Sequence, residues 1–481
     1  MRRFLLPVLA ALAGATPAAA QGIDTLAIRG HTRFLAHDLL AGRGTGTEGE
    51  AVAAAYVASQ LERLGLSPLP GAAGYKLPVP LGAAIIDPAS ALILRTDRDS
   101  TVFRYGTDFI FNTGAAPAFR GFAGDLVYFG DPADALARIA AEPTMHGRVA
   151  VFAGPLGAPA LEIVPALEAA GTRGVILLVP DADAYDLFVR SRGPRRYFVD
   201  APVDDPVWQP DLPVLLAGPE LTAALLDGVS PPPESWSRGR DLRRSVDARV
   251  AVQLEALSAA NVAAVLPGSD PALRDEYLVY TAHYDHLGIS APDVSGDSIY
   301  NGFSDNAAGV AMLLAIAEAL RDSPPGRSVA FLFLTAEERG LLGSSHLAAG
   351  GILPLQRVVA LINLDAGAPP APPVSWRIAG GLSALGEIAR EVAEERGWTA
   401  SLGAAGPNSD HWPFLQRGVP AIFIIPGSEW EDTSPEEREA LRRRWDRYHL
   451  PADHWNADFP FAGLGRYAEY ALLVGLRAVT K

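Results

Sequence analysis

The stretch that decides the fold lies between residues 276 and 345. It reads EYLVYTAHYDHLG over residues 276–288, DSIYNGFSDNAAGVAMLLAIAEAL over 297–320 and RSVAFLFLTAEERGLLGSS over 327–345. Residues 278–282 and 329–334 are apolar runs of strand length, and apolar residues recur at helical spacing between Val310 and Leu320. The order strand, helix, strand predicts a parallel βαβ unit, and sheets of this kind bind ligands beyond the carboxyl ends of their strands.

Acidic and imidazole side chains follow each predicted strand of this region. His283 comes at the end of the first strand, and Glu337 and Glu338 follow the second. A further apolar run over residues 358–364 is followed by Asp365. Because the carboxyl ends of neighbouring parallel strands meet at one edge, we expect these side chains to lie close together.

Two imidazoles and three carboxylates form the candidate metal site: His283, Asp305, Glu338, Asp365 and His449. Nitrogen and oxygen ligands of this kind suit zinc, and a carboxylate can bridge two ions. A pair of zinc ions can activate water and polarise a carbonyl group. Glu337 would then be free to act as the general base beside its neighbour Glu338.

Composition narrows the class of protein. A chain of 481 residues is too long for one ordinary core, which predicts two domains. The net charge of −15 argues against nucleic acid or an anionic membrane surface as a partner. With no cysteine in the sequence, thiolate metal sites and thiol nucleophiles are excluded.

The N-terminus has the pattern of a secretory signal peptide. Arg2 and Arg3 precede a mostly apolar run over residues 4–13, and small residues follow at 18–20. We expect cleavage near Ala20 and a periplasmic or secreted mature protein. No later apolar run reaches the roughly 18 residues that a membrane span needs.

The remaining chain divides into three parts. After the signal peptide (1–20), residues 21–110 are expected to form the N-terminal part of the main domain, with helices over 26–40 and 48–64. Residues 111–250 contain alternating strand and helix patterns and are expected to form an inserted α/β module. Residues 251–481 are expected to form the rest of the main domain.

Six motifs carry a resemblance to a known family: AHYDHLG, YNGFSDNAAGV, TAEERGLLGS, INLDAG, SDHWPFLQRGVPAIF and YHLPAD. Together they resemble the two-zinc aminopeptidase family that includes bacterial leucyl aminopeptidases, aminopeptidase Y and glutamate carboxypeptidase. The resemblance implies a mixed, mostly parallel sheet flanked by helices, with peptides as substrates and two zinc ions as cofactors. The module over 111–250 is similar to the protease-associated domain that is often inserted in this family.

The resemblance also implies individual roles. It assigns one zinc to His283, Asp305 and Asp365, and a second to Glu338 and His449, with Asp305 as the bridge. Glu337 takes the place of the general base. Three further assignments complete the prediction: Asp285 orients His283, Tyr448 stabilises the oxyanion, and Phe303, Asp410 and His411 contact the substrate. His286, His346 and His454 receive no ligand role.

Several functions remain open beside an aminopeptidase. The same family fold serves carboxypeptidases or dipeptidases, and a related reaction is glutaminyl cyclisation on a single zinc. From another class, a non-catalytic binding protein could use these carboxylates to hold a structural ion. A serine hydrolase is disfavoured because the sequence has no G-x-S-x-G motif, and H-E-x-x-H is also absent.

Overall fold

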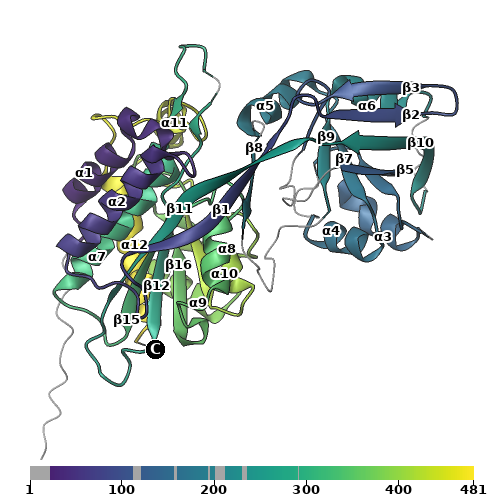
Figure 1. The fold of residues 1–481 in the computed structure, drawn as a ribbon. Coiled ribbons are helices and arrows are strands. Elements are labelled where there is room, and N and C mark those ends of the chain that lie inside the picture. Colours follow the sequence, from purple (N-terminus) through teal and green to yellow (C-terminus); the bar gives the residue numbers. More distant parts are fainter. Residues whose placement is uncertain are drawn as a thin grey trace, which may run out of the picture.

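The computed structural model describes residues 22–111, 121–142, 144–155, 160–192, 195–200, 212–229, 236–290 and 292–480. The predicted signal peptide over residues 1–20 lies outside this part of the chain. Two lobes are visible in Figure 1, and each is built around its own sheet.

The larger lobe contains a nine-stranded sheet in the order β18-β17-β19-β16-β12-β15-β11-β1-β8. The central strands β16, β12 and β15 are parallel, whereas β11, β1 and β8 are antiparallel to their neighbours. This confirms the predicted α/β fold with a mixed sheet. The bounds are β1 (Lys76–Ile86), β8 (Arg195–Val199), β11 (Val252–Leu266), β12 (Tyr277–His283), β15 (Ser328–Leu334), β16 (Val358–Asn363), β17 (Ser375–Ala379), β18 (Thr399–Gly403) and β19 (Ala421–Pro426).

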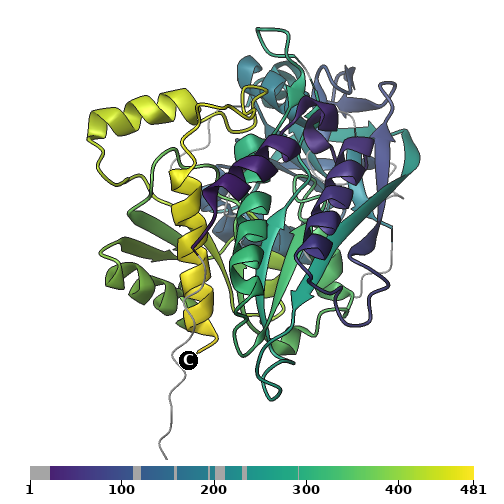
Figure 2. The same ribbon diagram turned by 90° about the vertical axis from the view of Figure 1, so that its left-hand side faces the viewer.

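Helices cover both faces of this sheet (Figures 1 and 2). One face carries α1 (Thr25–Leu35), α2 (Glu48–Arg63), α7 (Ala308–Arg321), α9 (Ala384–Glu395) and α12 (Ala462–Ala478). The opposite face carries α8 (Leu342–Ala349) and α10 (His411–Leu415). The helical segment Phe303–Arg321 is long and apolar enough to cross a membrane, but its most apolar window is 94% buried, which is the environment of a core helix.

The smaller lobe contains an eight-stranded sheet in the order β3-β2-β10-β5-β6-β7-β9-β4. Its strands are β2 (Ala91–Arg95), β3 (Ser100–Arg104), β4 (Phe109–Phe111), β5 (Gly121–Gly130), β6 (Val149–Phe152), β7 (Gly174–Leu178), β9 (Val214–Ala217) and β10 (Arg240–Arg249). Its helices are α3 (Ala135–Ala140), α4 (Ala160–Ala169), α5 (Ala182–Arg192) and α6 (Pro219–Leu226). The sheet already includes residues 91–111, so it begins before the predicted boundary at residue 111. Its identity as a protease-associated domain stays a prediction.

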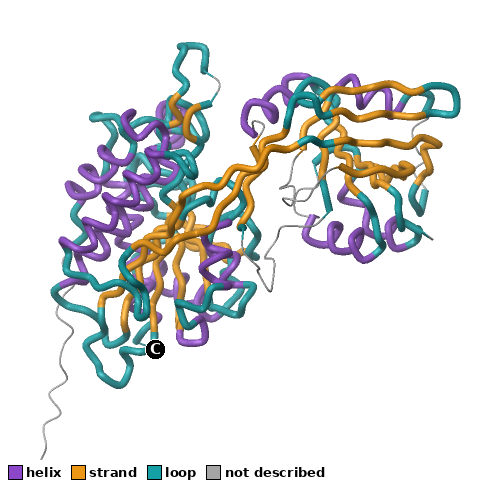
Figure 3. Tube along the Cα trace, viewed as in Figure 1, coloured by secondary structure: helices purple, strands orange, loops and turns teal. Residues whose placement is uncertain are grey.

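Two long strands join the lobes, as the tube in Figure 3 makes clear. β1 and β11 pair without interruption from Lys76 opposite Val262 to Ile86 opposite Val252. The chain therefore enters and leaves the smaller lobe at adjacent positions of one antiparallel pair.

A buried arginine attaches the N-terminal segment to the main sheet. Arg43 ends the short helical turn η1 (Asp38–Arg43) and is fully buried. Its guanidinium donates hydrogen bonds to the carbonyl oxygens of Leu35, Tyr284, Asn301 and Gly302 at 2.5, 2.8, 2.6 and 3.0 Å. Four carbonyl acceptors satisfy a buried cation without an ion pair, and they fix the loops that follow β12 and precede α7.

A buried carboxyl group makes a second attachment. Glu50, in the first turn of α2, is 1% exposed and accepts hydrogen bonds from the Thr335 hydroxyl and, at 2.6 Å, from the Gly46 backbone N–H. Burial and the Asp285 carboxylate together raise the pKa of Glu50 from 4.5 to about 8, although the two hydrogen bonds oppose the shift.

We predict that Glu50 makes the folded protein less stable as pH rises. Between pH 4.5 and 8 the unfolded chain has released the Glu50 proton while the folded chain retains it, so stability falls with pH. The full effect is roughly 3–5 kcal/mol. Glu50→Gln removes this dependence because its amide can accept from Gly46 and donate to Thr335.

The measurement is urea unfolding of wild type and Glu50→Gln, both loaded with zinc, at pH 6 and pH 9. The free energy of unfolding of the variant minus that of wild type should be larger at pH 9 than at pH 6. Metal binding is common to both proteins, so it cancels in the difference. An equal difference at the two pH values would contradict the prediction.

Candidate metal centre

Three neighbouring strands deliver acidic and imidazole side chains to one edge of the main sheet. β12 ends at His283, which lies opposite Leu334 at the end of β15, and β16 ends two residues before Asp365. The Asp365 Oδ1 atom lies 2.9 Å from His283 Nε2. The predicted convergence at the carboxyl ends of the strands is therefore present in the structure.

Two loops complete the cluster. Asp305 lies in the turn before α7, where its Oδ1 atom is 3.0 Å from His283 Nε2 and its Oδ2 atom is 2.9 Å from His449 Nε2. His449 follows α11 (Pro435–Trp445) and lies 3.4 Å from Glu338 Oε2. Asp305 thus contacts both imidazoles with separate oxygens. All five residues predicted as metal ligands lie in one cluster.

The loop that carries Asp305 depends on a glycine. Gly302 has φ of 57°, and a Cβ atom there would lie 2.2 Å from the Asp305 carbonyl oxygen and 2.5 Å from the His286 ring. Any side chain would therefore displace Asp305 or His286. The backbone N–H groups of Phe303 and Ser304 are held by Asp453, from its carbonyl oxygen and its carboxylate respectively.

His286 is a further member of this cluster, to which the sequence motifs assign no ligand role. It is fully buried, and its Nδ1 atom lies 2.6 Å from Glu338 Oε1 and 3.8 Å from Asp305 Oδ2. His286 lies three residues beyond His283 in the sequence. Spacing in a loop does not determine the direction of a side chain, so the sequence alone does not place His286 in the cluster.

The ligand atoms fall into two groups, each with its atoms within 4.8 Å of one another. One group contains His286, Asp305, Glu338 and His449, and the other contains His283, Glu337 and Asp365. Asp305 also contacts His283, so it connects the two groups.

The unpaired polar atoms of the first group fit a bound cation. Both ring nitrogens of His286, Glu338 Oε1 and His449 Nε2 are buried and have no hydrogen-bond partner among the described residues. The 2.6 Å contact between His286 and Glu338 lacks the angles of a hydrogen bond. Buried atoms of this kind cost free energy unless something binds them, and a nitrogen and oxygen set suits zinc.

The pKa values of Glu337 and its neighbour Glu338 are shifted in opposite directions. Burial raises the pKa of Glu337 well above 4.5, and the carboxylates of Asp365, Glu338 and Asp410 raise it further, although His283 opposes them. The pKa of Glu338 is lowered to about 2, because contacts with His286 and His449 outweigh burial and the Asp305 charge. Neighbouring glutamates therefore have opposite preferences for a proton.

Asp285 lies beneath both His283 and Glu337. Its Oδ1 atom accepts a hydrogen bond from the Glu337 backbone N–H at 3.1 Å and lies 3.6 Å from His283 Nδ1. Its Oδ2 atom accepts from the Thr45 hydroxyl at 2.8 Å. The Asp285 carbonyl oxygen is 3.1 Å from the same His283 nitrogen. These contacts fit the predicted role of orienting His283.

A chain of polar side chains supports Asp365. The Ser409 hydroxyl donates to Asp365 Oδ2, the Asn363 amide donates to Ser409 at 2.7 Å, and Thr281 donates to Asn363 at 2.7 Å. Ser409 precedes the predicted substrate residue Asp410 in the chain, and its hydroxyl contacts the carboxylate of a candidate ligand.

The predicted substrate residues Phe303, Asp410 and His411 are buried. Phe303 packs edge-on against Phe459, with ring centroids 4.9 Å apart, and the His411 ring is tilted against Phe423 at 5.5 Å. None of the three is among the residues that line the cavity beside the cluster. Contact with substrate would require a side chain to move, and their predicted role stays a prediction.

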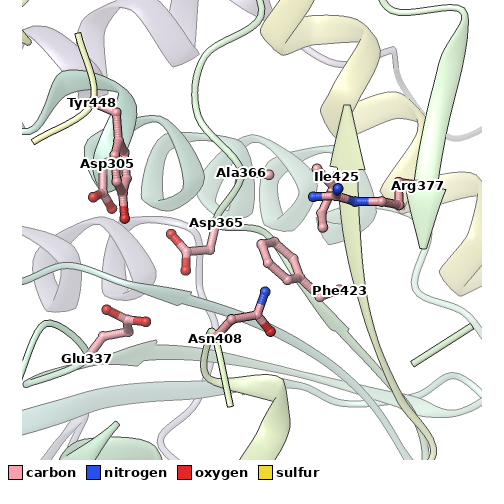
Figure 4. Close-up of a pocket in the computed structure, with 9 residues that line it drawn as sticks. All are labelled: Asp305, Glu337, Asp365, Ala366, Arg377, Asn408, Phe423, Ile425 and Tyr448. Atoms are coloured by element: carbon pink, nitrogen blue, oxygen red, sulfur yellow. The ribbon is translucent and has the colours of Figure 1, made fainter. Parts of the chain in front are cut away.

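A cavity of about 330 Å³ opens beside the carboxylates (Figure 4). Its volume is at the lower end of the range for small-ligand sites, roughly 300–1,000 Å³. The predicted oxyanion residue Tyr448 lines it, is 62% exposed and stacks on His449 with ring centroids 3.8 Å apart. The complete lining is Asp305, Glu337, Asp365, Ala366, Arg377, Asn408, Phe423, Ile425 and Tyr448.

Comparison with solved structures supports the fold. An aminopeptidase from Aneurinibacillus sp. strain AM-1 aligns with a TM-score of 0.58 and 18% identity, covering 96% of this chain and 94% of that one. BSAP, a zinc aminopeptidase from Bacillus subtilis, aligns with a TM-score of 0.51 and 21% identity, covering 94% of each chain. At these identities the likeness concerns the fold.

Sequence relatives match over shorter regions. Aminopeptidase YwaD of Bacillus subtilis is 32% identical over 187 residues, which cover 37% of this chain and 36% of YwaD. Glutaminyl-peptide cyclotransferase of Bos taurus is 30% identical over 211 residues, which cover 35% of this chain and 58% of that protein. Residues 261–474, which contain every candidate ligand, match the model of peptidase family M28.

Proposed function

We propose that this protein is a two-zinc exopeptidase that removes N-terminal residues from peptides. The observation that carries the proposal is the position of Glu337 in a cavity beside two adjoining groups of ligand atoms. The names of the relatives YwaD and BSAP, an aminopeptidase and a zinc aminopeptidase, support the reaction.

The five predicted ligands and His286 would hold the metal. His283 and Asp365 would bind one ion, His286, Glu338 and His449 the other, and Asp305 would contact both. When bound, zinc supplies a Lewis acid that polarises a carbonyl group and lowers the pKa of water.

Glu337 provides the proton transfer. Its carboxylate lines the cavity, so it can accept a proton from the attacking water and return it to the leaving amine. A carboxyl group whose pKa is raised by burial is suited to hold that proton between the two steps. Asp285 holds the Glu337 backbone in position through the 3.1 Å hydrogen bond.

Tyr448 supplies a hydrogen-bond donor to the same cavity. Partial burial and the surrounding carboxylates raise the pKa of Tyr448 well above 10, so the phenol keeps its proton at neutral pH. A protonated phenol can donate to the oxyanion that forms when water adds to the scissile carbonyl.

Glutaminyl cyclisation is the second candidate, favoured by the match to the bovine cyclotransferase. It would use a single zinc, whereas two groups of ligand atoms favour two ions. A carboxypeptidase or dipeptidase would use the same side chains, so the substrate's free terminus must distinguish it. A purely structural ion would give no reason for Glu337 to line a cavity.

We also propose that the protein is exported. The support is the basic, apolar and small-residue pattern of residues 1–20.

We predict that Glu337→Gln lowers kcat for L-leucyl p-nitroanilide by roughly 10²–10⁴-fold, because the amide cannot accept the proton from water. Bound zinc, measured by elemental analysis, should stay at the wild-type level. The matched control is Glu436→Gln in exposed α11, which should keep wild-type kcat.

N-acetyl-L-leucyl p-nitroanilide should not be cleaved by wild type. Near-wild-type turnover by Glu337→Gln would refute the mechanism, and cleavage of the blocked substrate would refute an aminopeptidase.

Removal of His449 should release one of the two ions. We expect His449→Ala to bind about one zinc per chain where wild type binds about two, because Asp305 and Glu338 lose their shared partner. Chelation should also lower the Tm of wild type, since the clustered carboxylates lose their counter-charge. His454→Ala, at an exposed position, is the control and should bind as much zinc as wild type. One zinc in wild type, with cyclisation of N-terminal glutamine, would support the cyclase instead.

The export proposal predicts the N-terminus of the mature protein. N-terminal sequencing of protein recovered from the periplasm or culture medium should begin at about Gln21. A variant with Ala18→Lys and Ala20→Lys should keep the leader, because signal peptidase requires small residues there. Full-length wild type confined to the cytoplasm would overturn the proposal.

A further inference from the structure

The cavity beside the metal centre has ends of opposite charge (Figure 4). Carboxylates of Asp305, Glu337 and Asp365 lie at one end. Arg377 lies at the other end, Asn408 lies between Arg377 and the carboxylates in this view, and the apolar side chains of Ala366, Phe423 and Ile425 complete the wall. Arg377 is the one cation among the lining residues.

The strand pattern explains why Arg377 faces the cavity. Its neighbours Trp376 and Ile378 pack into the core on the face that carries α9 and α12, so the alternation of β17 directs Arg377 to the opposite face of the sheet. There it lies opposite Ile425 of β19, which also lines the cavity. In Figure 4 the guanidinium lies beside Ile425 and extends from β17 into the pocket.

Arg377 has no acidic partner among the described residues. No ion pair or hydrogen bond in the described part of the chain involves its guanidinium, although other exposed arginines of this lobe pair readily. Arg390, for example, contacts Glu387 at 2.7 Å and Glu394 at 2.5 Å. The side chain of Arg377 is exposed, so its charge remains available to a ligand in the cavity.

We propose that Arg377 binds a carboxylate group of the substrate, an inference that rests on the proposed peptidase function. A guanidinium recognises a carboxylate through paired N–H donors, and the Asn408 amide lines the same cavity. In the proposed reaction the free α-amino group of the peptide lies at the metal-binding end of the cavity. The preferred substrates are therefore short peptides. The part of the peptide that occupies the cavity would have an amino group at one end and a carboxylate at the other.

Two sources could supply this carboxylate. One is the side chain of an N-terminal aspartate or glutamate, and the other is the terminal α-carboxylate of a dipeptide. A cavity of about 330 Å³ accommodates either of them but not a long peptide.

Matched substrate pairs distinguish the two sources. L-glutamyl and L-glutaminyl p-nitroanilide differ in the side-chain carboxylate, and L-leucyl-L-alanine and its amide differ in the terminal one. Wild type should show at least about tenfold higher kcat/KM for the charged member of one pair. Arg377→Gln should reduce that ratio to near 1, and Arg377→Lys should retain part of it. Arg357→Gln, at an exposed position remote from the cavity lining, should keep the wild-type ratio.

A binding measurement separates this inference from the proposed reaction. Calorimetry with zinc-loaded Glu337→Gln should show tighter binding of L-glutamate than L-glutamine, or of the dipeptide than its amide. Adding Arg377→Gln should abolish the difference. If no peptide is cleaved but this difference appears and depends on Arg377, the peptidase proposal fails and the carboxylate site stands. Cleavage of L-leucyl p-nitroanilide with no preference within either pair, in turnover or binding, would overturn the carboxylate site alone.

Discussion

Mutual repulsion among buried carboxylates is the constraint on which this structure depends. Asp305, Glu337, Glu338 and Asp365 meet at the carboxyl edge of three parallel strands, and three imidazoles lie among them. Buried like charges are costly unless opposite charge is supplied. A sheet that gathers these side chains is therefore built for cations, and the opposite proton preferences of Glu337 and Glu338 follow from the same crowding.

Much of the surrounding fold serves to hold this costly arrangement in place. Arg43 fixes the two ligand loops through backbone carbonyls and so adds positive charge without pairing with any ligand carboxylate. Asp285 ties the His283 loop to the Glu337 backbone, and Ser409 holds Asp365. The N-terminal segment thus supports the loops of the candidate metal centre, although it lies more than two hundred residues before His283 in the chain.

Sequence alone predicted the strands, and the candidate ligands His283, Glu338 and Asp365 at or after their ends, from local patterns, whereas the roles of the loop residues Asp305 and His449 were implied by the family resemblance. An apolar run followed by an acid or histidine marks the end of a parallel strand, and β12, β15 and β16 meet that description. Prediction from the sequence missed His286 and Arg377, because their importance depends on side-chain direction and on neighbours distant in the chain. The boundary at residue 111 failed for a related reason, because the short runs of β2 to β4 do not encode which sheet they join.

The continuous pairing of β1 with β11 makes the smaller lobe topologically equivalent to one very long hairpin loop. Since Ile86 lies opposite Val252, a tight turn could connect these strands, and the main sheet would lose only the edge strand β8. Such a module can be gained or lost in evolution without rethreading the core. The cost would be an exposed β1 edge that could pair with other chains, so β8 also acts as a guard against aggregation.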